Sequence, residues 1–169
     1  MLKFIKAVSI VLRLGPEKIE RLEKDSITDP LTGLLNRRGF QEHLTIEKER
    51  SERYGHSFLI VYVDMDNLKD INDSEGHEAG DKALTSLAKK IEENCRIMDF
   101  AARSGGDEFI VVFPETTEEE AEKIVERFRK IENVSVGYCQ YSSGITLEEA
   151  TKKAEGRMYE EKRKKKGVD

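Results

Sequence analysis

Apolar residues recur along the chain with two different spacings, which together predict a domain of mixed helices and strands. Short runs rich in β-branched and aromatic residues predict strands at 57–63, 100–104, 109–113 and 134–138. Segments with apolar residues three or four positions apart predict helices at 37–54, 78–95, 118–130 and 147–165. We therefore expect a sheet of four or five strands with helices covering one or both of its faces.

The first 24 residues form a separate amphipathic segment. Lys3, Lys6 and Arg13 share one side of a helical wheel, and apolar residues such as Phe4 and Val8 lie opposite. The apolar stretch is shorter than the roughly 20 residues that a membrane-spanning helix needs. We interpret 1–24 as a helical extension that packs on the domain or on a partner, and we favour this interpretation over a helix that lies on a membrane surface. The domain itself is placed at 25–169.

Composition narrows the function classes. The formal net charge of −5, from 34 acidic and 29 basic residues, argues against a nucleic-acid-binding domain. A polyanionic substrate would need a local basic cluster or a metal ion. Cys95 and Cys139 are far apart and form no CxxC pair, which predicts reduced thiols in a cytoplasmic protein.

Two pairs of acidic residues follow predicted strands. Asp64 and Asp66 come after 57–63, and Asp107 and Glu108 follow a Gly-Gly turn. Taken alone, each acidic pair is equally typical of a solvent-exposed turn without a function. If the two strands are neighbours, however, four carboxylates converge at one edge of the sheet, which is costly unless a cation neutralises them. Hard oxygen ligands select Mg²⁺ or Mn²⁺, and such a site suits phosphoryl or nucleotidyl transfer.

Several motifs in order resemble the GGDEF family of diguanylate cyclases. Residues 64–81 follow the pattern DxDxFKxINDxxGHxxGD almost throughout, and residues 96–109 follow RxxDxxxRxGGDEF. The segment DPLTGL at 29–34 and the segment SVG at 135–137 resemble two further motifs, so the resemblance covers about 25–166. A calcium-binding loop is the alternative for 64–81, but its Gly and terminal Glu do not fall in EF-hand register.

The resemblance implies an α+β fold. It predicts a central, mostly antiparallel sheet of about five strands flanked by helices, similar to the palm of nucleotidyl cyclases and polymerases. The implied activity joins two GTP molecules into cyclic di-GMP and releases two pyrophosphates. The implied assembly is a homodimer in which each 3′-hydroxyl attacks the α-phosphorus of the opposite GTP.

The resemblance also assigns roles at the acidic edge. It implies that Asp64, the Met65 carbonyl and Asp107 bind Mg²⁺ or Mn²⁺, and that Glu108 binds metal or assists deprotonation of the 3′-hydroxyl. Asp107, Glu108 and Lys69 are the expected catalytic residues. Which of Asp107 and Glu108 acts as the base stays open, because a metal ion alone can lower the pKa of the hydroxyl.

Further positions correspond to substrate contacts in the family. Asn72 and Asp81 match the pair that reads guanine, and a carboxylate at Asp81 can accept from the two donors of guanine but not from adenine. His77 belongs to the same motif, although a histidine that only anchors the loop is an equal interpretation. The lysines that match phosphate contacts are Lys69, Lys162 and Lys166.

Arg96 and Asp99 stand at the spacing of the family's inhibitory product site, and the resemblance implies that cyclic di-GMP binds there. A surface ion pair is the alternative for these two residues. A protein that binds GTP or cyclic di-GMP with little turnover, and signals through a partner, is the alternative for the whole chain. The short connection between 130 and 134 suggests that a hairpin of the family is trimmed here.

Overall fold

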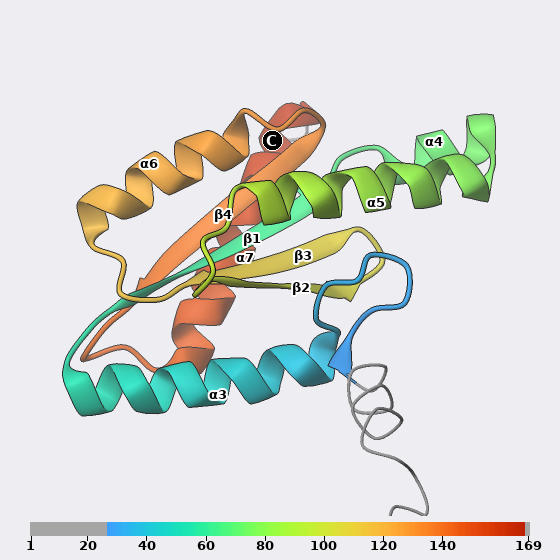
Figure 1. The fold of residues 1–169 in the computed structure, drawn as a ribbon. Helices are drawn as coiled ribbons and strands as arrows, with labels where there is room; N and C mark the ends of the chain where they lie inside the picture. The colour runs from blue at the N-terminus through green and yellow to red at the C-terminus, as the bar shows by residue number, and fades with distance from the viewer. Residues whose placement is uncertain (1–26, 168–169) are drawn as a thin grey trace, which may run out of the picture.

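The computed structural model describes residues 27–167, so the amphipathic segment predicted at 1–24 lies outside the described residues. The described chain forms one antiparallel sheet with the strand order β2-β3-β1-β4 (Figure 1). Its strands are β1 (Phe58–Met65), β2 (Phe100–Gly105), β3 (Glu108–Phe113) and β4 (Val134–Tyr141). The predicted antiparallel sheet flanked by helices is confirmed, but it has four strands where we expected about five.

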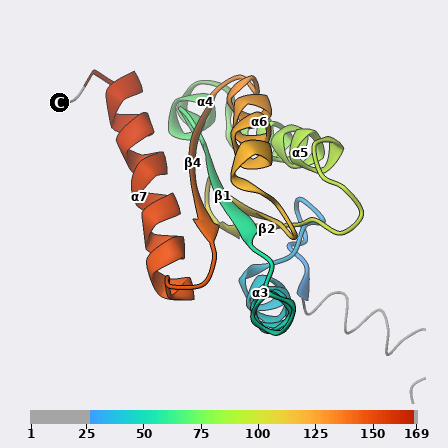
Figure 2. The ribbon, with the colours of Figure 1, turned by 90° about the vertical axis from the view of Figure 1, so that its left-hand side faces the viewer.

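Helices cover both faces of the sheet. Helices α3 (Arg37–Tyr54) and α7 (Leu147–Lys165) pack on one face, and α5 (His77–Glu93) and α6 (Glu118–Arg129) pack on the other. The short helix α4 (Leu68–Glu75) follows β1 and lies beside α5 (Figures 1 and 2). In Figure 2 the sheet is seen nearly edge-on, with α7 and α6 on opposite sides. The order of elements is the predicted one except for α4.

The alternation of side chains along the strands divides the core in two. On β1, Val61 and Val63 face α5 and α6, whereas Phe58 and Ile60 face α3 and α7. Every residue of β1 is buried, because the strand is central in the sheet and covered on both faces. This burial explains why its sequence is a continuous apolar run rather than an alternating one.

Helix ends fall where capping residues place them. Thr146 and Glu149 form a reciprocal capping box that starts α7, and Asn36 accepts hydrogen bonds from two amides at the start of α3. Gly55 ends α3 in the left-handed conformation with φ of 72°. The helices predicted at 37–54 and 147–165 are therefore confirmed at both ends.

Three elements differ from the prediction. Helix α4 was not predicted, and β1 and β4 each extend beyond the predicted strands, to Met65 and to Tyr141. Helix α4 has only eight residues, and its two apolar residues, Leu68 and Ile71, are half-buried, so the apolar repeat is too short to reveal a helix. Within residues 27–167, no helix combines the length and the apolar composition that crossing a bilayer requires.

A row of side chains on α7 bonds the outer edge of β4. Arg157, Glu161 and Lys165 are spaced four residues apart, so they share one side of the helix. Arg157 donates to the Tyr138 carbonyl (2.7 Å), Glu161 accepts from the Val136 amide (3.2 Å), and Lys165 donates to the Val134 carbonyl. These backbone groups are the ones that a further strand would need. Side chains of α7 therefore occupy the hydrogen-bonding positions along the outer edge of β4.

Candidate functional site

The two acidic segments of the sequence meet at one edge of the sheet. Antiparallel pairing of β1 with β3 places Asp64 directly opposite Glu108. The Met65 amide donates to the Asp107 carbonyl (3.0 Å), which joins the end of β1 to the turn before β3. β1 and β3 are therefore neighbours, as the predicted meeting of the two acidic segments requires.

Lys162 of α7 joins the carboxylates of this edge. Its ammonium donates to Asp64 Oδ1 and lies 3.4 Å from Asp107 Oδ2. Asp64 is buried, with 1% of its surface exposed, whereas the side chain of Asp107 is 36% exposed. One buried acid, one accessible acid and one lysine therefore share a small volume at the end of β1.

Burial governs the charge state of Asp64. Loss of solvent raises the pKa of Asp64 to about 6, the hydrogen bond from Lys162 opposes this rise, and the Asp107 charge adds to it. Burial alone would lower the pKa of Lys162, but its bond to Asp64 holds that pKa above the usual value. Burial thus disfavours the ionised form of Asp64, and the Lys162 ammonium favours it.

These donors fit a hard divalent cation. Asp64 and Asp107 already share one positively charged group, and carboxylate oxygens are the ligands that Mg²⁺ and Mn²⁺ prefer. Within residues 27–167, no three His, Cys, Asp or Glu side chains are gathered into a ready-made metal cluster. A cation held by Asp64 and Asp107 would have to compete with the Lys162 ammonium for the same two carboxylates.

The fourth expected carboxylate has other partners. Asp66 accepts a hydrogen bond from the Ser135 hydroxyl (2.7 Å) and lies 3.6 Å from the Lys165 ammonium. It is 9% exposed, and its amide donates to the Asn133 carbonyl (2.7 Å). The expected convergence of four carboxylates is thus wrong for Asp66, which ties the end of β1 to β4 and α7.

Glu108 has a partner to which the sequence assigned no role. The Tyr159 hydroxyl of α7 donates to Glu108 Oε1 (2.5 Å). Tyr159 and Lys162 are three residues apart, so they lie on one side of α7 and reach the same edge of the sheet. The only sequence signal for Tyr159 was its place one turn before a lysine already assigned to the site.

The Gly-Gly turn before β3 is held by Arg103 and has open space beside its two glycines. Arg103 donates to the Gly106 carbonyl from both Nε (3.0 Å) and Nη2 (2.7 Å), and its Nη1 lies 3.4 Å from Asp29 Oδ1. Gly106 adopts φ of 51°, and a Cβ placed at Gly105 or Gly106 would meet no atom within 4 Å. A ligand can therefore approach the backbone of this turn closely.

The residues assigned to guanine lie on α4 and α5. Asn72 is half-buried on α4, and its Oδ1 would lie 2.0 Å from a Cβ placed at Gly80. The Asn72 amide therefore rests against α5 at Gly80, the residue before Asp81 in the chain. The other predicted substrate residues, all exposed, are Lys69, His77 and Lys166.

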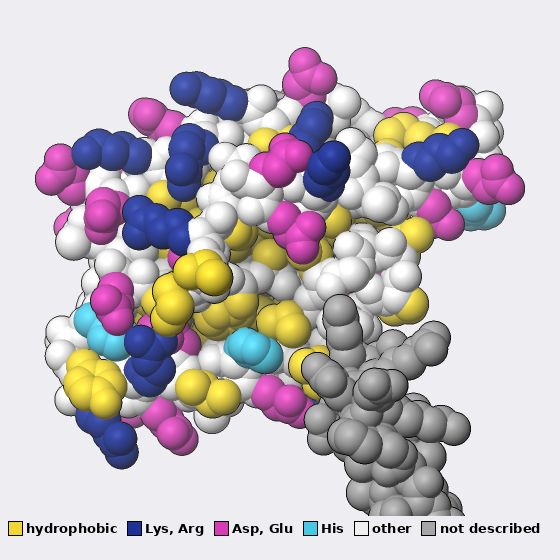
Figure 3. All heavy atoms as spheres, in the orientation of Figure 1, with side chains coloured by type: hydrophobic (Ala, Val, Ile, Leu, Met, Phe, Trp, Pro, Cys, Tyr) yellow, Lys and Arg dark blue, Asp and Glu magenta, His cyan; other side chains and the backbone are white. Residues whose placement is uncertain are grey.

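Arg96 and Asp99 form a closed turn at the start of β2. The Arg96 amide donates to Asp99 Oδ2 (2.6 Å), and the Asp99 amide donates to the Arg96 carbonyl (3.1 Å). Burial raises the pKa of Asp99. A cavity of about 420 Å³ adjoins the turn and is lined by residues that include His43 and Phe100. Figure 3 shows hydrophobic side chains together with histidine side chains on this face, in the region of α3.

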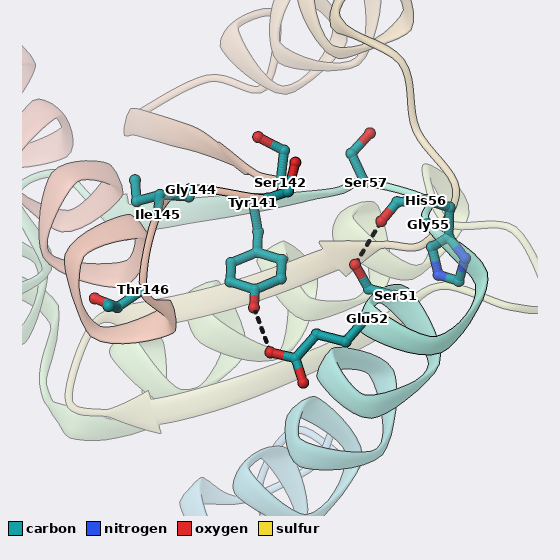
Figure 4. Close-up of a pocket in the computed structure, with 11 residues that line it drawn as sticks. Ser51, Glu52, Gly55, His56, Ser57, Tyr141, Ser142, Gly144, Ile145 and Thr146 are labelled. Atoms are coloured by element: carbon teal, nitrogen blue, oxygen red, sulfur yellow. Dashed lines mark hydrogen bonds between the residues drawn. The ribbon is translucent and has the colours of Figure 1, made fainter.

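The larger of these two cavities lies at the end of the sheet opposite the acidic edge (Figure 4). It has a volume of about 560 Å³ and lies between the end of α3, the end of β4 and the start of α7. Tyr141 donates to Glu52 (3.2 Å) and Ser51 donates to the His56 carbonyl within it. No residue assigned to the site from the sequence lines this cavity.

Metal binding at the acidic edge is expected to weaken below about pH 6. Because the pKa of Asp64 is raised to about 6, a proton competes with the cation for this carboxylate as the pH falls. The apparent affinity for Mn²⁺ should decrease about tenfold per pH unit below about pH 6 and level off above about pH 7. Titrations of Mn²⁺ between about pH 5 and 8, with Asp64→Asn as the control that lacks this step, would check it. An affinity that does not change over this range would contradict the prediction.

A family model described as "Diguanylate cyclase, GGDEF domain" matches residues 26–133. The chain is 42% identical over 111 residues to diguanylate cyclase DgcP of Pseudomonas aeruginosa, covering 66% of this chain and 16% of DgcP. It is 34% identical over 167 residues to probable diguanylate cyclase DgcJ of Escherichia coli, covering 92% of this chain and 33% of DgcJ. The chain thus spans a third or less of the length of these two relatives.

Solved structures give the same result. The coiled coil and GGDEF domain of DgcB from Caulobacter crescentus, in complex with c-di-GMP, is similar with a TM-score of 0.81 and 26% identity, over 98% of this chain and 94% of that one. Diguanylate cyclase SiaD of Pseudomonas aeruginosa, in complex with its activator SiaC, is similar with a TM-score of 0.78 and 31% identity, over 96% of this chain and 68% of that one. With the motifs in order on this fold, the chain belongs to the GGDEF domain family of diguanylate cyclases.

Proposed function

We propose that this chain is a diguanylate cyclase that condenses two GTP molecules into cyclic di-GMP and releases two pyrophosphates. The observation that carries the proposal is the shared edge of β1 and β3, where Asp64, Asp107 and Lys162 lie together. Two carboxylates and a mobile cationic side chain are the groups that a nucleoside triphosphate with a divalent cation requires. The relatives named diguanylate cyclases support the same reaction.

The chain's own residues would bind and orient the nucleotide. Asp64, the Met65 carbonyl and Asp107 would hold Mg²⁺ or Mn²⁺, with Glu108 as a further ligand or as the acceptor of the 3′-hydroxyl proton. The bound cation would neutralise the phosphates and lower the pKa of the attacking hydroxyl. Once it is released from Asp64, Lys162 is free to pair with phosphate oxygens.

The base would be read between α4 and α5. Asp81 can accept from N1–H and N2–H of guanine, and Asn72 beside it can both donate and accept. Adenine lacks this pair of donors, so it would leave Asp81 without a partner. Lys69 and Lys166 would contribute charge to the phosphates, and His77 would contact the substrate or hold the loop.

The reaction requires two copies of the domain. Each site holds one GTP, and each 3′-hydroxyl must reach the α-phosphorus of the GTP on the other copy. A two-fold homodimer gives both bonds the same geometry and removes the entropic cost of a bimolecular encounter. We propose such a homodimer as the catalytic assembly.

The Arg96–Asp99 turn would bind the product and inhibit the reaction. Arg96 is exposed and could pair with a phosphate or a guanine edge, and Asp99 could accept from guanine. The turn lies at the start of β2, whereas the Gly-Gly turn lies at its end, so the two sites are distinct. Inhibition would therefore require coupling along or around this strand.

One assay tests the reaction. The protein is incubated with GTP and Mg²⁺, and pyrophosphate release and the mass of the product are followed with and without added cyclic di-GMP. We expect two pyrophosphates for each cyclic di-GMP formed, and slower turnover when the product is added. Binding of GTP without pyrophosphate release would instead support a receptor that signals through a partner. Unchanged turnover with added product would contradict the inhibitory site.

Replacing Gly80 with alanine is expected to weaken GTP binding without unfolding the domain. The new Cβ would lie 2.0 Å from Asn72 Oδ1, so the Asn72 amide must leave its present place against α5. Displacing one guanine contact should raise the KM for GTP about tenfold, as an effect of about 1.4 kcal/mol. Steady-state kinetics would measure it. In an Asn72→Ala background the same change should add little, and a full additional effect there would show that Gly80 does not act through Asn72.

A further inference from the structure

The hydrogen bond between Tyr159 and Glu108 joins α7 to the first residue of β3. Glu108 stands opposite Asp64 in the β1–β3 pairing, so its carboxylate lies beside the acidic edge. The Tyr159 hydroxyl donates to Glu108 Oε1 (2.5 Å). This bond leaves Oε2 of the same carboxylate available for a cation or for a proton of the substrate.

The placement of Tyr159 indicates a role other than packing. Its surface is 43% exposed, whereas Met158 beside it on α7 is fully buried in the core. A tyrosine with this exposure leaves a large part of its surface in solvent, unlike the core residues of α7. Its defined contact is the hydroxyl bond to a carboxylate, and that bond fixes one of the two oxygens of Glu108.

Helix α7 is itself fixed relative to the sheet. Arg157, Glu161 and Lys165 bond the outer edge of β4, and Met158 of the same helix is fully buried in the core. A hydroxyl on this helix therefore presents a fixed donor to Glu108. A donor that does not move is what a carboxylate ligand needs in order to keep one orientation.

We propose that Tyr159 is a positioning residue for Glu108. It holds Oε1 through its hydroxyl, so that Glu108 presents Oε2 to the Asp64–Asp107 edge in a single orientation. This inference rests on the proposed function for its effect on turnover. Its effect on cation binding does not depend on which reaction the site performs.

The test compares two tyrosines that each donate to a glutamate. Tyr159→Phe removes the bond to Glu108, and Tyr141→Phe removes the bond to Glu52 (3.2 Å) at the opposite end of the sheet. Both changes delete one hydroxyl and keep the ring. For each variant and the unaltered protein, we would measure kcat and KM for GTP, the affinity for Mn²⁺ alone, and the Tm.

We expect Tyr159→Phe to lower kcat about tenfold, to weaken Mn²⁺ binding by a similar factor, and to change the KM for GTP less than about twofold. Tyr141→Phe should leave kcat and Mn²⁺ affinity unchanged. In a Glu108→Gln background, Tyr159→Phe should change Mn²⁺ affinity little further, because the group it orients is already altered.

Two results would overturn the inference. Tyr159→Phe with normal kcat and normal Mn²⁺ affinity would show that the hydroxyl does not position Glu108. A fall in kcat with unchanged Mn²⁺ affinity and a lowered Tm would show a structural role only. If the unaltered protein makes no cyclic di-GMP, the proposed function fails, and the Mn²⁺ comparison still decides whether Tyr159 positions Glu108.

Discussion

Replacing Asp107 with alanine is expected to reduce cyclic di-GMP formation about 1,000-fold or more while the domain stays folded. Asp107 would share a cation with Asp64, and loss of a ligand that stabilises developing charge costs several kcal/mol, with about 1.4 kcal/mol for each factor of ten. The side chain is 36% exposed and makes one ion pair, to Lys162 at 3.4 Å, so its removal opens no cavity in the core. Product formation by mass analysis and thermal unfolding would be measured together.

A matched control is available on another face of the molecule. Glu122 is exposed on α6, so Glu122→Ala also removes one surface carboxylate but should leave turnover unchanged. If Asp107→Ala kept normal turnover, the assignment of this edge as the catalytic site would be wrong. If it unfolded the domain, the exposed carboxylate would have a structural role that its contacts do not indicate.

Replacing Gly137 with alanine is expected to destabilise the domain by about 3 kcal/mol or more. A Cβ at Gly137 would lie 2.1 Å from the Met158 amide nitrogen and 2.2 Å from the Ala154 carbonyl oxygen, both of which are backbone atoms of α7. Helix α7 could not relax by a side-chain rotation and would have to move away from β4, at the upper end of the usual cost of overpacking. Urea unfolding would measure the loss.

Replacing Gly156 with alanine, on the same helix that Gly137 contacts, is expected to stabilise the domain. Gly156 is exposed, and a Cβ placed there would meet no atom within 4 Å. Alanine in a helix interior should increase the free energy of unfolding by about 1 kcal/mol. If both substitutions had the same sign, the close approach of α7 to β4 would not be what Gly137 provides.

Much of this arrangement could be predicted from the sequence because it rests on local rules. The apolar run at 57–63 predicted a strand, and the spacing of apolar residues predicted the helices at 37–54 and 147–165. The pairing of Asp64 with Glu108 followed once β1 and β3 were neighbours, since both acids adjoin strands at the same edge. These features depend on apolar periodicity and on the residues at strand ends, which can be recognised in a single sequence.

Other features depend on tertiary contacts that no local pattern encodes. Helix α4 has only two apolar residues, Leu68 and Ile71, both half-buried, so its apolar repeat is too short to recognise. Asp66 has the same residue type and nearly the same position as Asp64, but its partners, Ser135 and Lys165, come from distant segments. The bond from Tyr159 to Glu108 likewise joins residues that only the packing of α7 brings together.

The row of Arg157, Glu161 and Lys165 has a consequence for how other chains can associate with this domain. Exposed sheet edges commonly accept an extended peptide or seed aggregation by adding strands. Along β4, an incoming chain would have to displace charged side chains from three backbone groups in succession. At the other edge, Leu35 already exchanges backbone hydrogen bonds with β2 (3.1 Å and 2.9 Å). Partners would therefore recognise this domain through side-chain surfaces rather than by β-augmentation, and crowded copies would resist edge-to-edge aggregation.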